Sequence, residues 1–192
     1  MTQKYTGNPD IDKYLVQDIK PDSKTSGNYF LDYVSYTGSK KDINYVFTQY
    51  FNLDELTQHH NWIIRATVAR QGYGLNILIN DRDFCVRTLV AEQGYGLDIL
   101  INDPNDTVRC TVAQQKYRLD LLINDSSCHV RRIVADHGYG LEILINDRHS
   151  MVREAVAKQG YGLDILINDP NKHVRETAQR QLAKQYTITM YF

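Results

Sequence analysis

The chain has 192 residues and a formal net charge of −1, with 22 Lys and Arg set against 23 Asp and Glu. This balance argues against a general attraction to nucleic acid or to an anionic membrane, since both require an excess of positive charge. No N-terminal apolar stretch has the pattern of a signal peptide, and no run approaches the roughly 18 apolar residues of a membrane span. We therefore expect a cytoplasmic protein with no membrane partner, built as one domain or one domain with an appendage.

Residues 1–52 form a separate aromatic segment, which holds 10 of the 20 aromatic residues. Two stretches in it, 28–36 and 43–51, combine aromatic with β-branched residues and flank the polar turn Thr-Gly-Ser-Lys-Lys-Asp. This pattern predicts a β-hairpin. A helix over 43–51 stays open, because three apolar residues in that stretch are also spaced four residues apart.

Residues 53–185 form one array with a period of 22 residues. The thirteen residues QGYGLDILINDPN at 93–105 recur unchanged at 159–171, three periods later. The motif Leu-Ile-Asn-Asp ends at Asp81, Asp103, Asp125, Asp147 and Asp169, and Val-Arg follows at Arg87, Arg109, Arg131, Arg153 and Arg175. A fixed period of this length is typical of solenoids, in which stacked repeats bury apolar faces that one repeat cannot bury alone.

Each repeat is predicted to contain one longer and one shorter helix. We expect Asp103 at the N-cap and Pro104 at the first position of a three-turn helix, with Val108 and Val112 on one face. Glycines after these helices are expected to close them in the left-handed conformation. These are Gly72, Gly94, Gly138 and Gly160. The apolar segment 97–101 has room for one or two turns, and we expect part of it to be 3₁₀.

The repeat resembles HEAT-type repeats and is most similar to the leucine-rich repeat variant, which pairs an α-helix with a short 3₁₀ helix. The residues that carry the resemblance are Leu-Ile-Asn-Asp, four variable positions and Val-Arg-x-x-Val-Ala, over about 130 of 192 residues. The spacing of six between Asp81 and Arg87 matches the buried Asp/Arg ladder of such repeats. His59 replaces the ladder aspartate in the first repeat, as expected of a cap. The iron–sulfur cysteine cluster of some leucine-rich variant proteins is absent, so none is inherited.

No pattern predicts an enzyme, and we expect no catalytic residue, metal or cofactor. A catalytic group stands in one place, whereas the motif residues recur in every repeat, which indicates a structural role. The three cysteines lie in different repeats, and His129 and His173 lie two repeats apart, so a shared metal is not expected. The column of repeated tyrosines is interpreted as packing between repeats, with a stacking ladder for bases or sugars as the alternative. It comprises Tyr73, Tyr95, Tyr117, Tyr139 and Tyr161.

Partner-binding residues are expected where the repeats differ, in the four positions between Leu-Ile-Asn-Asp and Val-Arg. The candidates there are Trp62, Phe84, Asp106, His129, His149 and Lys172. The middle repeat offers a second candidate, because Lys116-Tyr117-Arg118 replaces Gly-Tyr-Gly and Arg131 and Arg132 follow in the next helix. This basic cluster predicts contact with an acidic partner or a phosphate backbone, against the plainer interpretation of a solvated face.

Residues 186–192 alternate in the manner of a β-strand, with Tyr186, Ile188, Met190 and Phe192 on one side. The two ends of the array are too far apart for this strand to reach its own hairpin. We expect it to join a second protomer, giving a homodimer, or a partner by β-augmentation. The expected fold is mainly α, a right-handed α-solenoid of about six HEAT-like repeats with an N-terminal hairpin and a C-terminal strand, α+β overall.

The predicted function is non-enzymatic binding of another macromolecule, most plausibly a protein, through the variable edge and the concave face of the solenoid. Units of the form VR-x-x-VA-x-QGYGLD-x-LIND also resemble repeat proteins of bacteria and their mobile elements. That resemblance implies an alternative, a phage-type inhibitor that occludes a host defence nuclease in the manner of an anti-CRISPR protein. A second alternative is a nucleic-acid-binding HEAT-like protein or DNA-repair enzyme, which the net charge of −1 disfavours.

Overall fold

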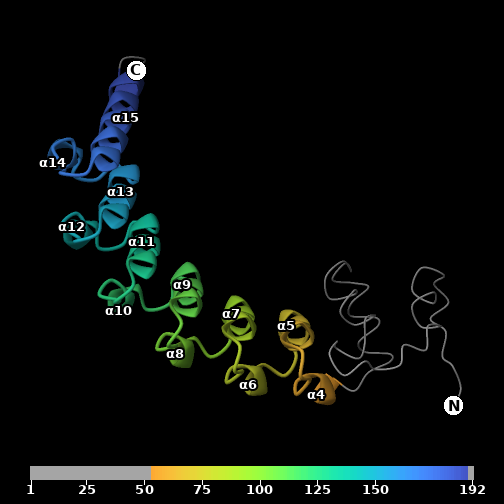
Figure 1. Cartoon of the computed structure of the whole chain (residues 1–192). Coiled ribbons are helices and arrows are strands. Elements are labelled where there is room, and N and C mark those ends of the chain that lie inside the picture. The colour runs from red at the N-terminus through yellow and green to blue at the C-terminus, as the bar shows by residue number, and fades with distance from the viewer. Residues whose placement is uncertain (1–52, 190–192) are drawn as a thin grey trace, which may run out of the picture. The chain divides into compact units, whose positions relative to one another are not determined.

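The computed structural model describes residues 53–189 of the chain, and every regular element in that range is a helix. The chain divides into two compact units, which we call the N-terminal body (1–93) and the C-terminal body (94–192). In the described part, twelve helices alternate between short and long along the sequence (Figure 1). The structure thus shows a helical repeat array of the kind expected for a solenoid.

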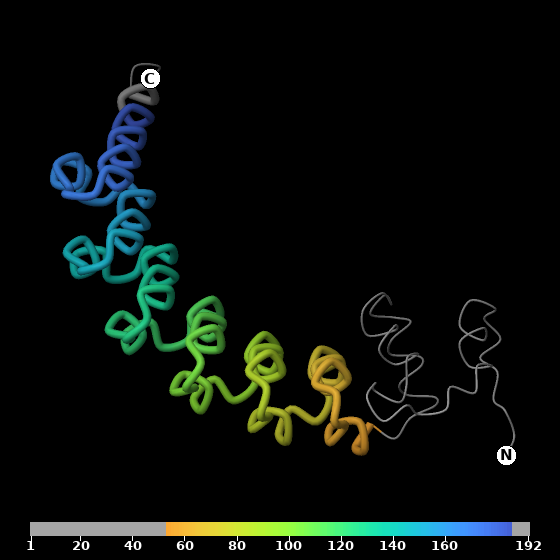
Figure 2. Tube along the Cα trace, viewed as in Figure 1, coloured from red at the N-terminus to blue at the C-terminus, as the bar shows by residue number. Residues whose placement is uncertain are grey.

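The described helices of the N-terminal body are α4 (Leu53–Leu56), α5 (Trp62–Arg70), α6 (Leu75–Leu78) and α7 (Phe84–Glu92). Those of the C-terminal body are α8 (Leu97–Leu100), α9 (Asp106–Gln114), α10 (Leu119–Leu122), α11 (Cys128–Asp136), α12 (Leu141–Leu144), α13 (Ser150–Lys158), α14 (Leu163–Leu166) and α15 (Lys172–Thr189). Within the C-terminal body, the short helices follow one side of the chain trace and the long helices the other (Figure 2).

The core runs along the long helices. In the C-terminal body α9 packs on α11, α11 on α13 and α13 on α15, and in the N-terminal body α5 packs on α7. The Val-x₃-Val-Ala positions of α7, α9, α11 and α13 are completely buried, as Val108, Val112 and Ala113 are in α9. Each short helix adds its last leucine, such as Leu100 of α8, to this core. The apolar residues that recur with the period of the sequence are therefore the residues that form the core.

The long helices begin later than the sequence predicts. The N-cap of α9 is Asn105, whose extended backbone (φ −90°, ψ 124°) and side chain cap the helix at the amide of Thr107. Asp103, which we expected at the cap, instead accepts a hydrogen bond from the Asn105 amide at 2.9 Å. The predicted cap is wrong because this carboxylate holds a turn before the helix, so Pro104 precedes the first helical residue, Asp106.

Left-handed residues close the long helices, as the glycine pattern predicts. Gly138 follows α11 with φ +72° and Gly160 follows α13 with φ +78°. A second glycine, which the sequence analysis did not single out, is also left-handed and directly precedes α6, α8, α12 and α14, as Gly140 does with φ +61°. A Cβ atom at Gly140 would collide with Cδ1 of Ile123 in the preceding repeat, so this glycine also permits a close approach.

The short helices are single α-helical turns with 3₁₀-type hydrogen bonds at their ends. In α6, Ile79 bonds to Leu75 across four residues, whereas the amides of Asn80 and Asp81 each bond to the carbonyl three residues back. The expectation of a partly 3₁₀ segment agrees with this pattern. The result is a short, tight link between the Tyr turn and the next long helix.

The expected C-terminal strand is wrong. Residues 186–189 belong to α15, and no strand occurs anywhere in residues 53–189, so the α+β assignment fails for the described part of the chain. Gln181-Leu-Ala-Lys184 stands where earlier repeats have Gln-Gly-Tyr-Gly. Without a left-handed glycine nothing ends the helix, and adding residues to a formed helix is favourable.

Because the strand is absent, the expected β-augmentation through Tyr186 and Ile188 loses its basis. Met190 and Phe192 lie outside the described residues, as does the predicted N-terminal hairpin in 1–52. No helix within residues 53–189 is long and apolar enough to span a membrane.

Candidate protein-binding surface

The repeated arginines and aspartates are bound to each other inside the array. Arg109 makes a bidentate ion pair with Asp125 of the next repeat, at 2.8 and 2.9 Å. Its Nη1 also donates to the carbonyl of Asp103 in its own repeat, at 2.7 Å. The same pairing joins Arg65 to Asp81, Arg131 to Asp147 and Arg153 to Asp169. These pairs form an Asp/Arg ladder between successive repeats, and their charges are not free for binding.

The ladder changes the pKa values of its carboxyl groups. Burial alone would raise the pKa of Asp125 and Asp147, but the paired arginine and a backbone amide two residues ahead lower each pKa below its ordinary value. For Asp169, the hydrogen bond from Arg153 is the largest effect and lowers the pKa. These aspartates therefore stay ionised and cannot serve as proton donors near neutral pH.

Two glutamines of the repeat motif, one after α13 and one at the equivalent position within α15, have a structural role as well. Gln159 donates its side-chain amide to the carbonyl of Asp136, the last residue of α11, at 2.9 Å. Gln181 does the same for Lys158 at the end of α13, at 3.2 Å. These contacts satisfy carbonyls that a helix end leaves without partners. The ladder and the glutamines together explain most polar residues of the repeat motif.

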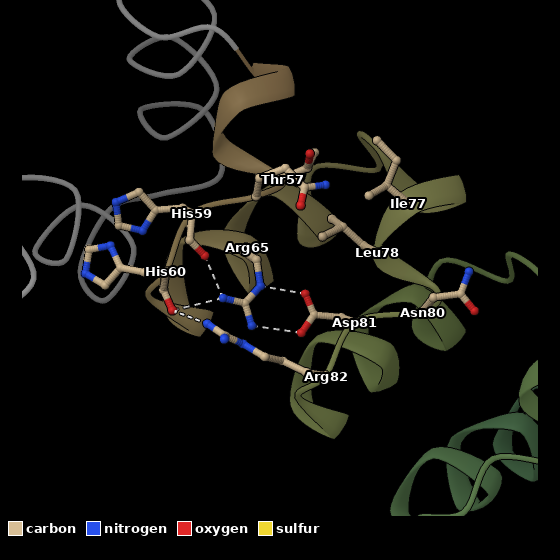
Figure 3. A pocket seen from close by; sticks show the side chains of 10 residues that line it. Thr57, His59, His60, Arg65, Ile77, Leu78, Asn80, Asp81 and Arg82 are labelled. Atoms are coloured by element: carbon tan, nitrogen blue, oxygen red, sulfur yellow. Dashed lines mark hydrogen bonds and ion pairs between the residues drawn. The ribbon is translucent and has the colours of Figure 1, made fainter.

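A groove of about 480 Å³ lies in the N-terminal body between the ends of α4 and α6 (Figure 3). The Arg65 guanidinium spans it, bonding to Asp81 on one side and to the His59 carbonyl on the other, at 2.6 Å. The backbone carbonyl of His59 thus occupies the place of the ladder aspartate carbonyl in the later repeats. Arg82 donates to the carbonyl of His60 at 2.9 Å, and the ring centroids of the two histidines lie 4.4 Å apart with the rings tilted by 31°.

The same groove recurs 66 residues later, in the C-terminal body, with a volume of about 420 Å³. It is lined by the equivalent positions, among them Ile143, Asn146 and Arg148. The groove is therefore a property of the repeat and not of the histidines at its first occurrence. A paired ladder arginine and aspartate line each groove, Arg65 and Asp81 in the first and Arg131 and Asp147 in the second.

The variable positions that we predicted as partner-binding lie at the N-terminal ends of the long helices. Trp62 and Phe84 are the first residues of α5 and α7, and both are exposed. In the C-terminal body Asp106 begins α9 and accepts a hydrogen bond from Ser127 at 2.7 Å. His129 lies in the first turn of α11, His149 caps α13 and Lys172 begins α15. The structure thus gives these residues one common location in each body, and their role in binding stays a prediction.

The basic cluster of the middle repeat is mostly neutralised by nearby carboxylates. Arg118 pairs with Asp120 at 3.0 and 2.9 Å, and Arg131 is buried in the ladder. Arg132 pairs with Asp136 at 3.2 Å, one helical turn away. Lys116 is exposed, and no ion pair of it occurs within residues 53–189. The four residues therefore do not form a common site for a phosphate backbone.

The short helices carry a feature that the sequence analysis missed, an exposed aliphatic side chain at their third position. In the C-terminal body these residues, which we call the aliphatic column, are Ile99, Leu121, Ile143 and Ile165, with exposed fractions of 57%, 52%, 57% and 60%. A helical wheel could have found them, because a four-residue helix that covers its first residue at least partly and buries its fourth must turn its third outward. The tyrosines preceding α8, α12 and α14 are also partly exposed, at 42% each, and their packing between repeats stays a prediction.

Nothing in the described part of the chain suggests a metal centre, since no three His, Cys, Asp or Glu residues in it lie close enough to hold one ion. The three cysteines are unpaired, and burial raises the pKa of Cys110 to about 11, which makes its thiol unreactive near neutral pH. No family model matches the chain, and neither a curated protein nor a solved structure matches it.

Proposed function

We propose that the protein is a non-enzymatic binding module whose protein partner docks on the aliphatic column of the C-terminal body. The observation that carries the proposal is the exposure of an aliphatic side chain at the same place in four successive repeats. Single exposed apolar residues are ordinary on soluble proteins, but an apolar feature that recurs along one face is typical of an interaction surface.

A comparison of the repeats with one another supports this choice of surface. The first residues of the long helices in the C-terminal body are Asp106, Cys128, Ser150 and Lys172, and they share no chemical character. The third residues of its short helices are all Ile or Leu. Lys172 is exposed and the other three residues of the first set are half-buried, whereas the whole second set is exposed. Folding alone therefore does not explain why the more exposed set is the one that stays apolar. Binding of a partner on these residues explains why they stay apolar.

The remaining polar residues of the motif support a binding protein more than an enzyme. The ladder charges are paired within the array, and the motif glutamines bond to helix ends. An enzyme needs titratable groups placed for proton transfer or attack, and a strongly basic face would be needed for nucleic acid. The neutralised middle repeat does not supply such a face.

The test is an affinity purification from native-host lysate with half of each sample treated with nuclease. The bait is compared with an Ile99→Ser/Ile143→Ser/Ile165→Ser variant and with a control variant, His129→Ala/His149→Ala, at the long-helix ends. We expect a stoichiometric protein that resists nuclease, binds the control variant and is lost with the triple variant.

Three other outcomes point elsewhere. Loss of the partner with the histidine variant alone would move the site to the variable edge. Partners that disappear with nuclease would favour the nucleic-acid alternative. A captured host nuclease whose activity falls on binding would favour the inhibitor alternative.

A further inference from the structure

The aliphatic column does not stand alone, because a carboxylate and a tyrosine accompany it in three of the four repeats. The carboxylate directly precedes the exposed isoleucine, and the tyrosine lies two residues before the short helix. All three side chains are exposed in each of these repeats. The triplets are Tyr95/Asp98/Ile99, Tyr139/Glu142/Ile143 and Tyr161/Asp164/Ile165.

The carboxylates of the triplets differ from the ladder aspartates, because no ion pair neutralises them within residues 53–189. They also do not cap the short helices, since the N-cap is a glycine and makes no side-chain hydrogen bond. A helix of one turn has only a small dipole, so its interaction with Asp98, Glu142 or Asp164 is weak. Their negative charge is therefore available to a ligand.

The chemistry of a triplet matches the side chain of lysine or arginine. The ammonium or guanidinium group pairs with the exposed carboxylate, and a tyrosine ring attracts cations through its π face. The aliphatic stem of the same side chain covers the exposed isoleucine. An acidic or nucleic-acid ligand would instead meet repulsion from the carboxylates.

We propose that the partner of the C-terminal body is a polypeptide segment that carries Lys or Arg side chains among aliphatic ones, one cation for each triplet. This inference rests on the proposed function and adds the chemical character of the partner. It follows from charge complementarity between the partner and three exposed carboxylates beside an apolar column.

The α10 repeat differs from the other three, and this difference determines how a partner aligns along the surface. In the α10 repeat Arg118 already occupies the carboxylate of Asp120, and Lys116 adds a further positive charge. The partner position opposite α10 must therefore be uncharged or acidic. We therefore expect the partner to place a cation opposite α8, α12 and α14 and none opposite α10. Successive positions should be about 8–10 Å apart, the usual spacing of packed helices.

The experiment is a selection of displayed random peptides on the immobilised full chain, followed by fluorescence-anisotropy titration of synthetic copies of the selected peptides. Three variants are compared with the wild type after far-UV circular dichroism shows that they fold. The first is Asp98→Asn/Glu142→Gln/Asp164→Asn, the second is the triple isoleucine-to-serine variant, and the third is Lys116→Gly/Arg118→Gly.

We expect selected peptides rich in Lys or Arg and in aliphatic residues. Three exposed cation contacts imply that neutralising the carboxylates weakens binding by at least about tenfold. The serine variant should lose binding, and the glycine variant should accept a fourth cation. Peptides without a basic excess, or peptides that bind the neutralised variant as tightly as the wild type, overturn the basic partner while leaving the binding surface intact. Peptides that bind the serine variant equally well, or no selected peptide at all, overturn the proposed function itself.

Discussion

Replacing Asp147 by alanine should be among the most destabilising single changes in the C-terminal body. Asp147 accepts two hydrogen bonds from Arg131, at 2.6 and 2.9 Å, and the side chains of both residues are only 7% exposed. Its removal leaves a buried guanidinium with two unsatisfied donor groups. Breaking a buried ion pair in this way costs about 3–5 kcal/mol.

The lost turn contact adds to this cost. The Asp147 carboxylate also accepts the backbone amide of His149 at 2.8 Å, which positions the N-cap of α13. One such hydrogen bond contributes about 1 kcal/mol. Asp147→Asn keeps an acceptor for this amide and should be the milder change. Against a typical total stability of about 5–15 kcal/mol, Asp147→Ala removes a large share.

The assay is urea unfolding followed by far-UV circular dichroism, with Asp120→Ala as the matched control. Asp120 also pairs with an arginine, but that pair is about half exposed at 51% and 49%, so its loss should barely move the unfolding midpoint. A double variant, Arg131→Leu/Asp147→Leu, should be more stable than Asp147→Ala, since it buries no unpaired charge. If Asp147→Ala unfolds at the same urea concentration as Asp120→Ala, the account of the ladder is refuted.

Three further predictions concern the same frame. The pKa of Asp147 is lower in the folded state than in the unfolded state, so its ionised carboxylate contributes fully to stability above about pH 5. This contribution is lost as pH falls through the lower pKa. In the variant Asp147→Asn, the melting temperature should therefore fall less steeply below about pH 4 than in the wild type. Gly140→Ala should destabilise more than Gly138→Ala in urea unfolding, because only the former drives a Cβ into Ile123; equal midpoints would contradict the close approach. Lys116→Gly should raise the free energy of unfolding by about 0.5–1 kcal/mol, since a left-handed lysine at φ 58° is strained, and an unchanged midpoint would contradict that strain.

The sequence was informative where a local rule and the repeat period agreed. A glycine every 22 residues, just after an apolar helical pattern, identified the ends of the long helices because a single backbone conformation is wanted there. The ladder partners could be expected from the resemblance, since the spacing of Asp and Arg is constant. The direction of the pairing, from Arg109 forward to Asp125, required the packed structure.

The errors arose where two local rules competed. Residues 186–192 alternate like a strand, but the decisive signal was upstream, in the missing glycine at Leu182. Aspartate is favoured at N-caps, but the carboxylate of Asp103 instead accepts a hydrogen bond in the turn before the helix. The true cap is Asn105, two residues later. The positive charge of the candidate basic cluster was overestimated, because the sequence did not reveal that Asp120 pairs with Arg118.

The forward direction of the ladder bears on how such a protein changes its length. A repeat in the C-terminal body holds an acceptor for the repeat before it, as Asp125 does for Arg109, and a donor for the repeat after it, as Arg131 is for Asp147. A duplicated block of 22 residues therefore arrives with one half of each of its two junctions, and the neighbouring repeats supply the other halves. Recombination between copies can thus insert or delete whole blocks without new compensating substitutions. The identical stretches at 93–105 and 159–171 are what such exchange would leave behind. An insertion of any other length would change the constant separation of 16 residues between donor and acceptor, so the ladder favours the 22-residue period.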